Sequence, residues 1–330
     1  MKLRAAIIAA LGVALALYLV MYVGSGAIFS AAVRVGWSGF GILCFYALGL
    51  LLLLGAAWYV LLPDSSPAGP WVFVWGRMVR DAAAEVLPFS QLGGMALGAR
   101  AVILLGSPTP LVLASVIVDV TTEMLAQVVY TALGVILLIV RAPRTSLGMS
   151  LTPVFVVGLV LAAVGCGLFL VLQRYGHRLA ARLAARFLPG VVAHTTAVGA
   201  ALDGIYRSPV RIGLSSTLHL AGWIASATGT WIAFRLIGAR VDLTSAIAIE
   251  SLVYATRSAA AFIPNALGVQ EAAYAVLAPL FGVGAEFGLA VSLLKRARDI
   301  ALGVPILLIW QAVEGRRALT AGLGAIRDSE

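Results

Sequence analysis

Residues 261–271 read AFIPNALGVQE, and this stretch decides how the chain is organised. It lies in a long apolar region, yet Pro264, Gly268 and Glu271 follow one another closely. Proline removes a backbone donor and glycine weakens a helix, so the helix is expected to break here. Broken backbone at membrane depth is tolerated only where protein or a water-filled cavity surrounds it. The stretch therefore predicts an interrupted helix beside a polar space inside a membrane.

The composition of the whole chain places it in a membrane. Its 330 residues are 62% hydrophobic and 11% charged, and the mean hydropathy is +1.03. Soluble domains are about 45–50% apolar and about 25% charged, which excludes that class. We interpret the net charge of +9 as loop charge facing an anionic cytoplasmic leaflet rather than as a nucleic-acid surface.

Six stretches are long enough to span a bilayer, which takes about 20 apolar residues. They are residues 5–23, 37–62, 110–140, 152–172, 212–237 and 286–310. The first is interpreted as a retained span, because it is longer than the apolar core of a signal peptide, about 7–15 residues. Two further regions, 80–105 and 244–281, are apolar on average but are cut by Pro and Gly and carry charges.

The basic segment 174–211 sets the orientation. It holds six arginines against the single acid Asp203, so it is predicted to be cytoplasmic, as are both termini. If regions 80–105 and 244–281 each enter the membrane and leave it on the same side, the segment 174–211 and both termini all lie in the cytoplasm. The arginines of 174–186 fit either a basic helix on the lipid headgroups or a solvated loop.

The two interrupted regions resemble each other. Residues 85–94 read EVLPFSQLGG, and Pro264 lies 176 positions after Pro88. The same shift moves span 37–62 onto 212–237 almost completely. It also moves the acids of the 110–140 span onto charged residues of the last span: Asp119 onto Lys295, and Glu123 onto Asp299.

This shift predicts an all-α polytopic membrane protein built as an inverted repeat. The single transmembrane domain, 1–330, would comprise halves 1–145 and 152–315. Two Pro/Gly-broken re-entrant hairpins would enter from opposite faces and meet near the midplane, where transporters of this kind hold their substrate.

Charged residues in these segments mark the candidate cavity, because a charge at the bilayer centre costs about 2.5–3.5 kcal/mol on insertion scales. Together with the residues of the two breaks, the candidates are Glu85, Pro88, Gln91, Gly93, Gly94, Arg100, Asp119, Glu123, Arg257, Pro264, Asn265, Gly268, Gln270, Glu271, Lys295, Arg296, Arg298 and Asp299.

Three expectations follow from the charges. The acidic face of Asp119 and Glu123 can neutralise the largely basic face around Lys295 if the two spans pack together. The arginines of the second half, Arg257, Arg296 and Arg298, suit a phosphate or another anionic headgroup. Glu85 and Glu271 can pair with them or take up protons. A buried ion-pair network that only locks the bundle is the alternative to a working cavity.

No catalytic, metal or cofactor motif accompanies these charges. The three histidines, His177, His194 and His219, lack ligand spacing. Cys44 and Cys166 lie in apolar runs and are interpreted as small buried hydrophobes. No catalytic residue, metal or cofactor is therefore expected.

The two broken motifs resemble those of the flippase-like lysylphosphatidylglycerol-synthase transmembrane superfamily. The second is the more specific, with Pro264, Gly268 and Glu271 in the family's order. VRDAAAEVLPFSQLGG, residues 79–94, is most similar to the hopanoid-biosynthesis-associated HpnL-type branch. Gln270 stands where the family often has Arg, and a single Gly268 where Gly-x-Gly is common. This departure favours a lipid other than a simple phospholipid.

The resemblance implies a multi-pass protein of the bacterial inner membrane that transports or handles hopanoids or related polar lipids. Its partners would be membrane lipids and lipid-biosynthesis enzymes, with no nucleic acid. No synthase domain is recognised in the 330 residues, so synthase activity is not expected. A membrane-embedded lipid-modifying enzyme of the transferase type and a scaffold for hopanoid biosynthesis remain the alternatives.

Overall fold

The structure is a computed structural model that describes residues 25–63, 68–87, 90–141, 146–187, 192–260 and 263–327. Within these ranges the regular elements are all helical, as predicted. They are α2 (Ser25–Tyr59), α3 (Pro70–Val86), α4 (Ser90–Leu104), α5 (Thr109–Arg141), α6 (Ser146–Phe187), α7 (Val192–Tyr206), α8 (Pro209–Leu236), α9 (Leu243–Ala259), η2 (Pro264–Ala266), α10 (Val269–Leu277), η3 (Ala278–Phe281) and α11 (Ala285–Arg327).

Three of the described helices are long and apolar enough to cross a membrane. They are Val35–Tyr59 within α2, Thr109–Arg141 and Leu147–Gln173, and they confirm three of the predicted spans. α8 and α11 are helical where the next two spans were predicted, but their sequences are more polar. The predicted span 5–23 lies outside the described residues.

The order of helices recurs along the chain. A long helix, two short helices and another long helix form the series α2 to α5, and the series α8 to α11 repeats this order. α3 and α9 are both 17 residues long. α5 begins at Thr109 and α11 at Ala285, again a shift of 176 positions. The turns before them use Gly106 and Gly282, with φ of 95° and 76°, a conformation that favours glycine.

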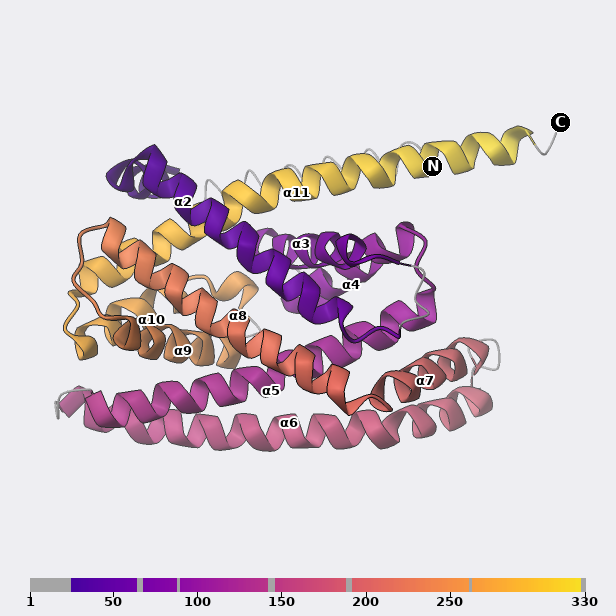
Figure 1. Cartoon of the computed structure of the whole chain (residues 1–330), viewed down its shortest axis with the longest axis horizontal. Coiled ribbons are helices and arrows are strands. Elements are labelled where there is room, and N and C mark those ends of the chain that lie inside the picture. The colour runs from indigo at the N-terminus through magenta and orange to yellow at the C-terminus, as the bar shows by residue number, and fades with distance from the viewer. Residues whose placement is uncertain are drawn as a thin grey trace.

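Helix packing follows the same correspondence. α3 packs against α11, and α9 packs against α5; likewise α2 packs against α11, and α8 against α5. α2 and α8 lie side by side and run in opposite directions (Figure 1). Their contacts pair Leu54 with Gly222 and Tyr46 with Gly229, which is the order of an antiparallel crossing. The two series are therefore interlocked, because α5 and α11 each pack against a short helix of the other series.

The first interrupted region is a tight hairpin of α3 and α4. It begins at Pro70, ahead of the predicted start at residue 80. Gly94 and Gly98 allow the close approach, because a Cβ at Gly94 would lie 2.5 Å from the Arg80 carbonyl oxygen. A 17-residue helix is about 25 Å long, shorter than the hydrocarbon core of about 30 Å. Pro88 lies outside the described residues.

The second interrupted region contains α9, η2, α10 and η3. Between α9 and α10 the backbone turns sharply, with positive φ at Asn265, Ala266 and Gly268. The largest apolar cluster holds this region against α8 and α11, with Phe234, Leu277 and other buried side chains. Both interrupted regions thus form short helical hairpins beside a long helix.

Candidate functional site

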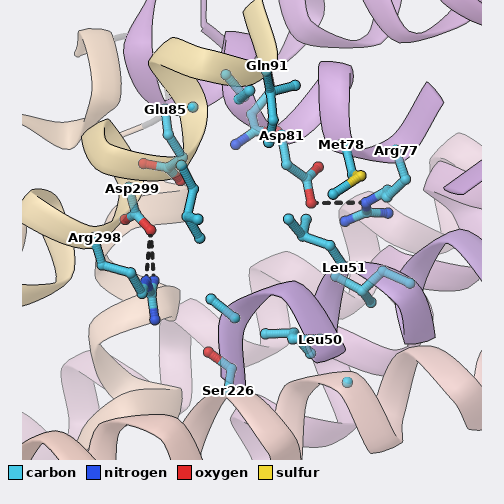
Figure 2. Close-up of a pocket in the computed structure, with 18 of the residues that line it drawn as sticks. Leu50, Leu51, Arg77, Met78, Asp81, Glu85, Gln91, Ser226, Arg298 and Asp299 are labelled. Carbon is cyan, nitrogen blue, oxygen red and sulfur yellow. Dashed lines mark hydrogen bonds and ion pairs between the residues drawn. The ribbon is translucent and has the colours of Figure 1, made fainter. Parts of the chain in front are cut away.

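A cavity of about 180 Å³, lined by both charged and apolar side chains, lies between α2, α3, α8 and α11, with single residues from α4, α5 and α9 in its wall. Figure 2 shows Arg298 and Asp299 on one side, with Arg77 and Asp81 facing them across the cavity. Its charged lining residues are Arg77, Asp81, Glu85, Glu123, Arg298 and Asp299. The volume of about 180 Å³ gives room for roughly six water molecules, at about 30 Å³ for each.

Four pairs of lining residues stand 176 positions apart. They are Ala47 with Trp223, Leu50 with Ser226, Met78 with Tyr254, and Glu123 with Asp299. At these four positions the two series of helices contribute equivalent residues to one cavity. Three of the pairs differ in chemistry, because the first series offers an aliphatic side chain where the second offers an aromatic or hydroxyl group. The fourth pair is acidic on both sides.

The first charge cluster joins α3 to α5. Arg77 donates to Glu123 at 2.7 Å, and Arg80 donates to Asp119 at 2.6 Å and to Glu123 at 2.5 Å. His219 of α8 lies 2.9 Å from the second carboxylate oxygen of Asp119. The Asp119 side chain is fully buried, whereas Glu123 is 18% exposed and reaches the cavity. Two arginines thus hold both acids in place.

The second charge cluster lies in the other series. The Lys295 ammonium of α11 contacts the Glu250 carboxylate of α9, and the Tyr274 hydroxyl of α10 donates to the same carboxylate. Lys295 also donates to Thr230 at 3.2 Å. Ser226, which lines the cavity, donates to Glu250 at 3.0 Å. This hydroxyl connects the buried pair to the cavity wall.

An ion pair ties the two hairpins together. Arg257 at the end of α9 donates to both oxygens of Glu85 at the end of α3, at 2.8 and 3.1 Å. The Asn265 amide donates to the backbone carbonyl of Glu85. Within α11, Arg298 donates to Asp299 at 2.7 and 3.0 Å.

Glu271 fixes the break of the second hairpin. Its carboxylate accepts the Gly268 backbone N–H at 2.8 Å and contacts the Arg296 guanidinium. Arg296 also donates to the carbonyl oxygens of Asn265 and Ala266. These bonds satisfy backbone groups that the break leaves unpaired, so Arg296 and Glu271 hold the turn rather than face the cavity.

The structure brings five of the predicted site residues to the cavity wall: Glu85, Gln91, Glu123, Arg298 and Asp299. Six others are paired behind it: Asp119, Arg257, Asn265, Glu271, Lys295 and Arg296. Gln270 is buried and donates to Ser292. Pro264 begins η2 and Gly268 precedes α10. Gly93 and Gly94 lie in α4, where Gly94 meets α3.

Two expectations about these residues were wrong. Arg100 is not in the cavity: its side chain is 52% exposed and pairs with Glu314. The faces of Asp119 and Lys295 do not neutralise each other, because arginines of α3 neutralise the first and Glu250 of α9 neutralises the second. The pairing of Glu85 and Glu271 with arginines, which the sequence left open, is present.

Several residues of the site escaped the sequence analysis. Arg77 and Arg80 belong to α3, where their three-residue spacing could have marked one helix face. His219 is 1% exposed and lies beside the Asp119 carboxylate. No local sequence pattern predicts this contact. Trp223 and Tyr254 form an edge-to-face pair at 4.7 Å in the cavity wall.

The balance of charges limits what the cavity can bind. Two arginines and four carboxylates line it, and each of these arginines bonds to a carboxylate. Carboxylates outnumber guanidinium groups among the described lining residues, which opposes binding of a bare phosphate beside Arg298, contrary to the expectation for this residue. Carboxylates and aromatic rings instead suit hydroxyl or amine groups. In the described part of the chain, no group of His, Cys, Asp or Glu is arranged to hold a metal ion.

The fold and site define an all-α membrane protein with a charged internal cavity. The sequence profile of the lysylphosphatidylglycerol synthase TM region matches residues 7–306, and the chain belongs to this family, which is related to lipid handling. No curated protein and no solved structure matches the chain.

Proposed function

We propose that the protein is a lipid transporter of the bacterial inner membrane that moves hopanoids or related polar lipids between leaflets. The observation that carries this proposal is the charged cavity to which both series of helices contribute equivalent positions. A headgroup would pass through the cavity while its hydrocarbon part stays in the bilayer.

The proposed architecture is an inverted repeat. The antiparallel run of α2 and α8 supports it, because equivalent helices that cross a membrane in opposite directions are the mark of inversion. The reciprocal packing of α3 on α11 and α9 on α5 also supports it. We assign the repeat halves to 1–145 and 152–315 of a single domain.

The hairpins α3–α4 and α9–α10 are proposed to be re-entrant from opposite faces. Their helices have at most 17 residues, short for a full crossing, and the Glu85–Arg257 pair joins them at their inner ends. On this path the segment 174–211 and both termini are cytoplasmic, whereas Arg141 is external.

The size and charge of the cavity favour the substrate class. Sites for whole drug-sized ligands are about 300–1,000 Å³, so about 180 Å³ suits a headgroup alone. With four carboxylates against two arginines among the described lining residues, a headgroup with hydroxyl or amine groups fits better than a bare phosphate. Polar hopanoid derivatives would satisfy this requirement.

Reconstituted protein tests the transport proposal. Wild-type vesicles should exchange a labelled polar hopanoid between leaflets. The Asp299→Asn variant should exchange it about tenfold more slowly, the effect of about 1.4 kcal/mol. Arg100→Ala serves as the control, because Arg100 is exposed, pairs with Glu314 and does not line the cavity. Wild-type exchange no faster than in Asp299→Asn or protein-free vesicles would contradict the proposal.

Lipid extracts of a deletion strain separate transport from the other roles. A normal hopanoid inventory in the wrong leaflet supports transport. A missing derivative supports a lipid-modifying enzyme, although Asp119 and Glu123 are already engaged by arginines and are poorly placed for acid–base work. Unchanged lipids after neutralisation of the cavity charges would support a scaffold for lipid-biosynthesis enzymes.

A further inference from the structure

A buried histidine lies one helical turn behind the cavity wall. His219 of α8 is 1% exposed, and Gly222 and Trp223, three and four residues further along the same helix, line the cavity. The Nε2 atom of His219 lies 2.9 Å from the Asp119 carboxylate of α5. Titratable side chains inside a membrane segment are costly and often mark proton relays. Because histidine changes charge between about pH 5 and 8, this position is able to respond to pH.

The charges around His219 do not balance. Two guanidinium groups of α3 bond to three carboxylates: Arg77 and Arg80 donate, and Asp81, Asp119 and Glu123 accept. With these groups ionised, the cluster carries one net negative charge while His219 is neutral. Protonation of His219 brings the net charge to zero. An uncompensated charge is costly in the interior, so the charge balance favours the proton.

Hydrogen bonding opposes the proton. In the neutral ring with its hydrogen on Nε2, His219 donates to Asp119 and Nδ1 is an acceptor. Nδ1 is buried and has no hydrogen-bond partner within the described part of the chain. A second proton would turn Nδ1 into a buried donor without an acceptor, and such a group is destabilising. Neither protonation state is therefore fully satisfied, so a small change in the surroundings is enough to shift the balance.

Other charged groups on the helices packed against α8 are paired with each other. Glu250 of α9 and Lys295 of α11 contact each other and reach α8 further along its length. The same two helices carry three more ion pairs: Arg257 with Glu85, Arg296 with Glu271, and Arg298 with Asp299. The described titratable side chains of α2 are thiol and phenol groups, those of Cys44, Tyr46 and Tyr59. α8 itself carries Arg211 and Arg235 near its two ends.

The second charge cluster has no such imbalance. Lys295 faces one carboxylate, that of Glu250. The position equivalent to His219, 176 residues earlier, is Leu43, which belongs to the apolar cluster that includes Tyr274. The titratable ring thus lies beside the cluster with the excess carboxylate, and an apolar side chain takes the equivalent place in the balanced half.

Arg80 connects the buried ring to the cavity wall. It donates to Asp119 at 2.6 Å and to Glu123 at 2.5 Å. Its Nε atom lacks a hydrogen-bond partner among the described residues and lies 4.0 Å from a carboxylate oxygen of Asp81. A positive charge on His219 would neutralise more of the Asp119 charge and allow Arg80 to turn towards Glu123 and Asp81. Both of these acids line the cavity, so the state of the ring affects the cavity wall.

We propose that His219 is a proton-binding site that controls the charge of the cavity wall. A proton from water in the cavity forms the second N–H bond of the ring, and the cluster loses its net negative charge. Release of the proton to water restores that charge. A less negative wall attracts hydroxyl and amine hydrogens less, so protonation should slow lipid exchange. The proton site stands by itself, whereas its effect on exchange rests on the proposed transport function.

Nuclear magnetic resonance of the imidazole nitrogens tests proton binding directly. The chain has three histidines, and a His177→Gln/His194→Gln background leaves His219 as the one labelled ring. The full chain, labelled with nitrogen-15 histidine, is placed in nanodiscs. The Nδ1 signal should change from that of a neutral ring to that of a protonated ring between about pH 8 and about pH 5. A ring that stays in one state across this range would overturn the site.

The pH dependence of exchange tests the effect on the cavity. The probe is a labelled hopanoid with an uncharged polyol headgroup, which has no charge of its own to titrate. Wild-type exchange should be about tenfold slower at about pH 5.5 than at about pH 8, the effect of about 1.4 kcal/mol. His219→Gln can still donate to Asp119 but cannot bind the proton. Its exchange should therefore stay near the faster wild-type rate at both pH values.

The His177→Gln/His194→Gln background is the matched control and should keep the wild-type pH dependence. Loss of the dependence in this control, or its retention in His219→Gln, would overturn the effect of His219 on the cavity. The two proposals can fail separately. A ring that titrates without any wild-type exchange would contradict only the transporter, whereas exchange with a ring that does not titrate would contradict only the proton site.

Discussion

The two series of helices solve the same packing problem with opposite charges. In the first, the long helix α5 carries Asp119, and arginines of the hairpin helix α3 neutralise it. In the second, the equivalent position of α11 carries Lys295, and Glu250 of the hairpin helix α9 neutralises it. In both series, opposite charges on the hairpin helix and on the long helix that follows it neutralise each other. The acidic and basic residues exchange places between the two series.

In the cavity wall, by contrast, one pair of equivalent positions has the same charge in both series. Glu123 and Asp299 occupy equivalent positions and are both acidic, and both reach the cavity. Their neighbours differ, since two arginines grip Glu123 whereas Asp299 bonds to Arg298. The buried pairs therefore belong to the scaffold, and the exposed carboxylates are the better candidates for contact with a substrate.

The largest effect should come from breaking the more isolated buried pair. Lys295→Met leaves the fully buried Glu250 without its cation, and we expect a loss of about 3–5 kcal/mol of unfolding free energy. Arg77→Met should cost less, about 1–3 kcal/mol, because Arg80 still contacts both Asp119 and Glu123. Unfolding in detergent measures both changes.

A double variant controls this prediction. Lys295→Met combined with Glu250→Gln removes the stranded charge, so much of the lost stability should return. Equal losses for Lys295→Met and Arg77→Met, or a double variant no more stable than Lys295→Met, would remove the proposed difference between the two series.

The hairpins should respond differently to a single methyl group. Gly94→Ala places a Cβ 2.5 Å from the Arg80 carbonyl oxygen and should cost about 1–3 kcal/mol through steric strain. At Gly268 nothing lies within 4 Å, and only its backbone conformation opposes a side chain, at about 1–3 kcal/mol, because φ 78° with ψ −35° lies outside the left-handed helical region.

Size dependence separates the two causes. Extending the substitution from Ala to Ser should worsen the loss of stability at position 94, because the Cβ there already lies 2.5 Å from backbone and a further atom needs still more room. The loss at position 268 should change little from Ala to Ser. The same size dependence at both glycines would contradict the distinction.

The smallest effect concerns the start of the equivalent helices α9 and α3. Asp242 caps α9 by accepting the Ser245 backbone N–H, whereas Gly69 before α3 makes no side-chain cap bond. Hydrogen bonding by Ser245, assisted by Thr244 and Arg141, lowers the pKa of the Asp242 carboxyl below its usual value. Asp242→Ala should cost about 1 kcal/mol at pH 7.

The pH dependence has a definite sign. Because the folded pKa is depressed, the stabilisation by ionised Asp242 is present above the unfolded pKa of about 3.9 and is lost as the pH falls through the lower folded value. Asp242→Asn should retain most of the cap but lose this dependence. An unchanged pH profile of unfolding in Asp242→Asn would contradict the assignment.

The sequence predicted the parts of the fold that depend on local pattern. Apolar runs identified the helices at 37–62 and 110–140, and Pro and Gly located both hairpins. Gly94 was predicted to line the cavity, but it is not among the lining residues and instead allows close contact between α4 and α3. These features could be predicted because hydropathy and backbone conformational preference depend on residues that are close together in the sequence.

The partners of the buried charges could not be predicted in the same way. Asp119 meets His219 across 100 residues and Arg80 across 39, and both contacts exist only because separate helices pack together. The shift of 176 positions aligned Asp119 with Lys295, but equivalence in a repeat does not mean contact. Arg100 likewise looked buried by its apolar neighbours, yet it lies on the exposed face of α4.

The central claim is that the two series enter the membrane in opposite directions and enclose the cavity between them. Thr109 and Ala285, the exposed first residues of α5 and α11, are equivalent positions at the bases of the two hairpins. Single cysteines there, with Cys44 and Cys166 replaced by serine, can be labelled with a membrane-impermeant maleimide. We predict that Thr109→Cys reacts only from the cytoplasmic side and Ala285→Cys only from the outside. Reaction of both cysteines from the same side would contradict the account.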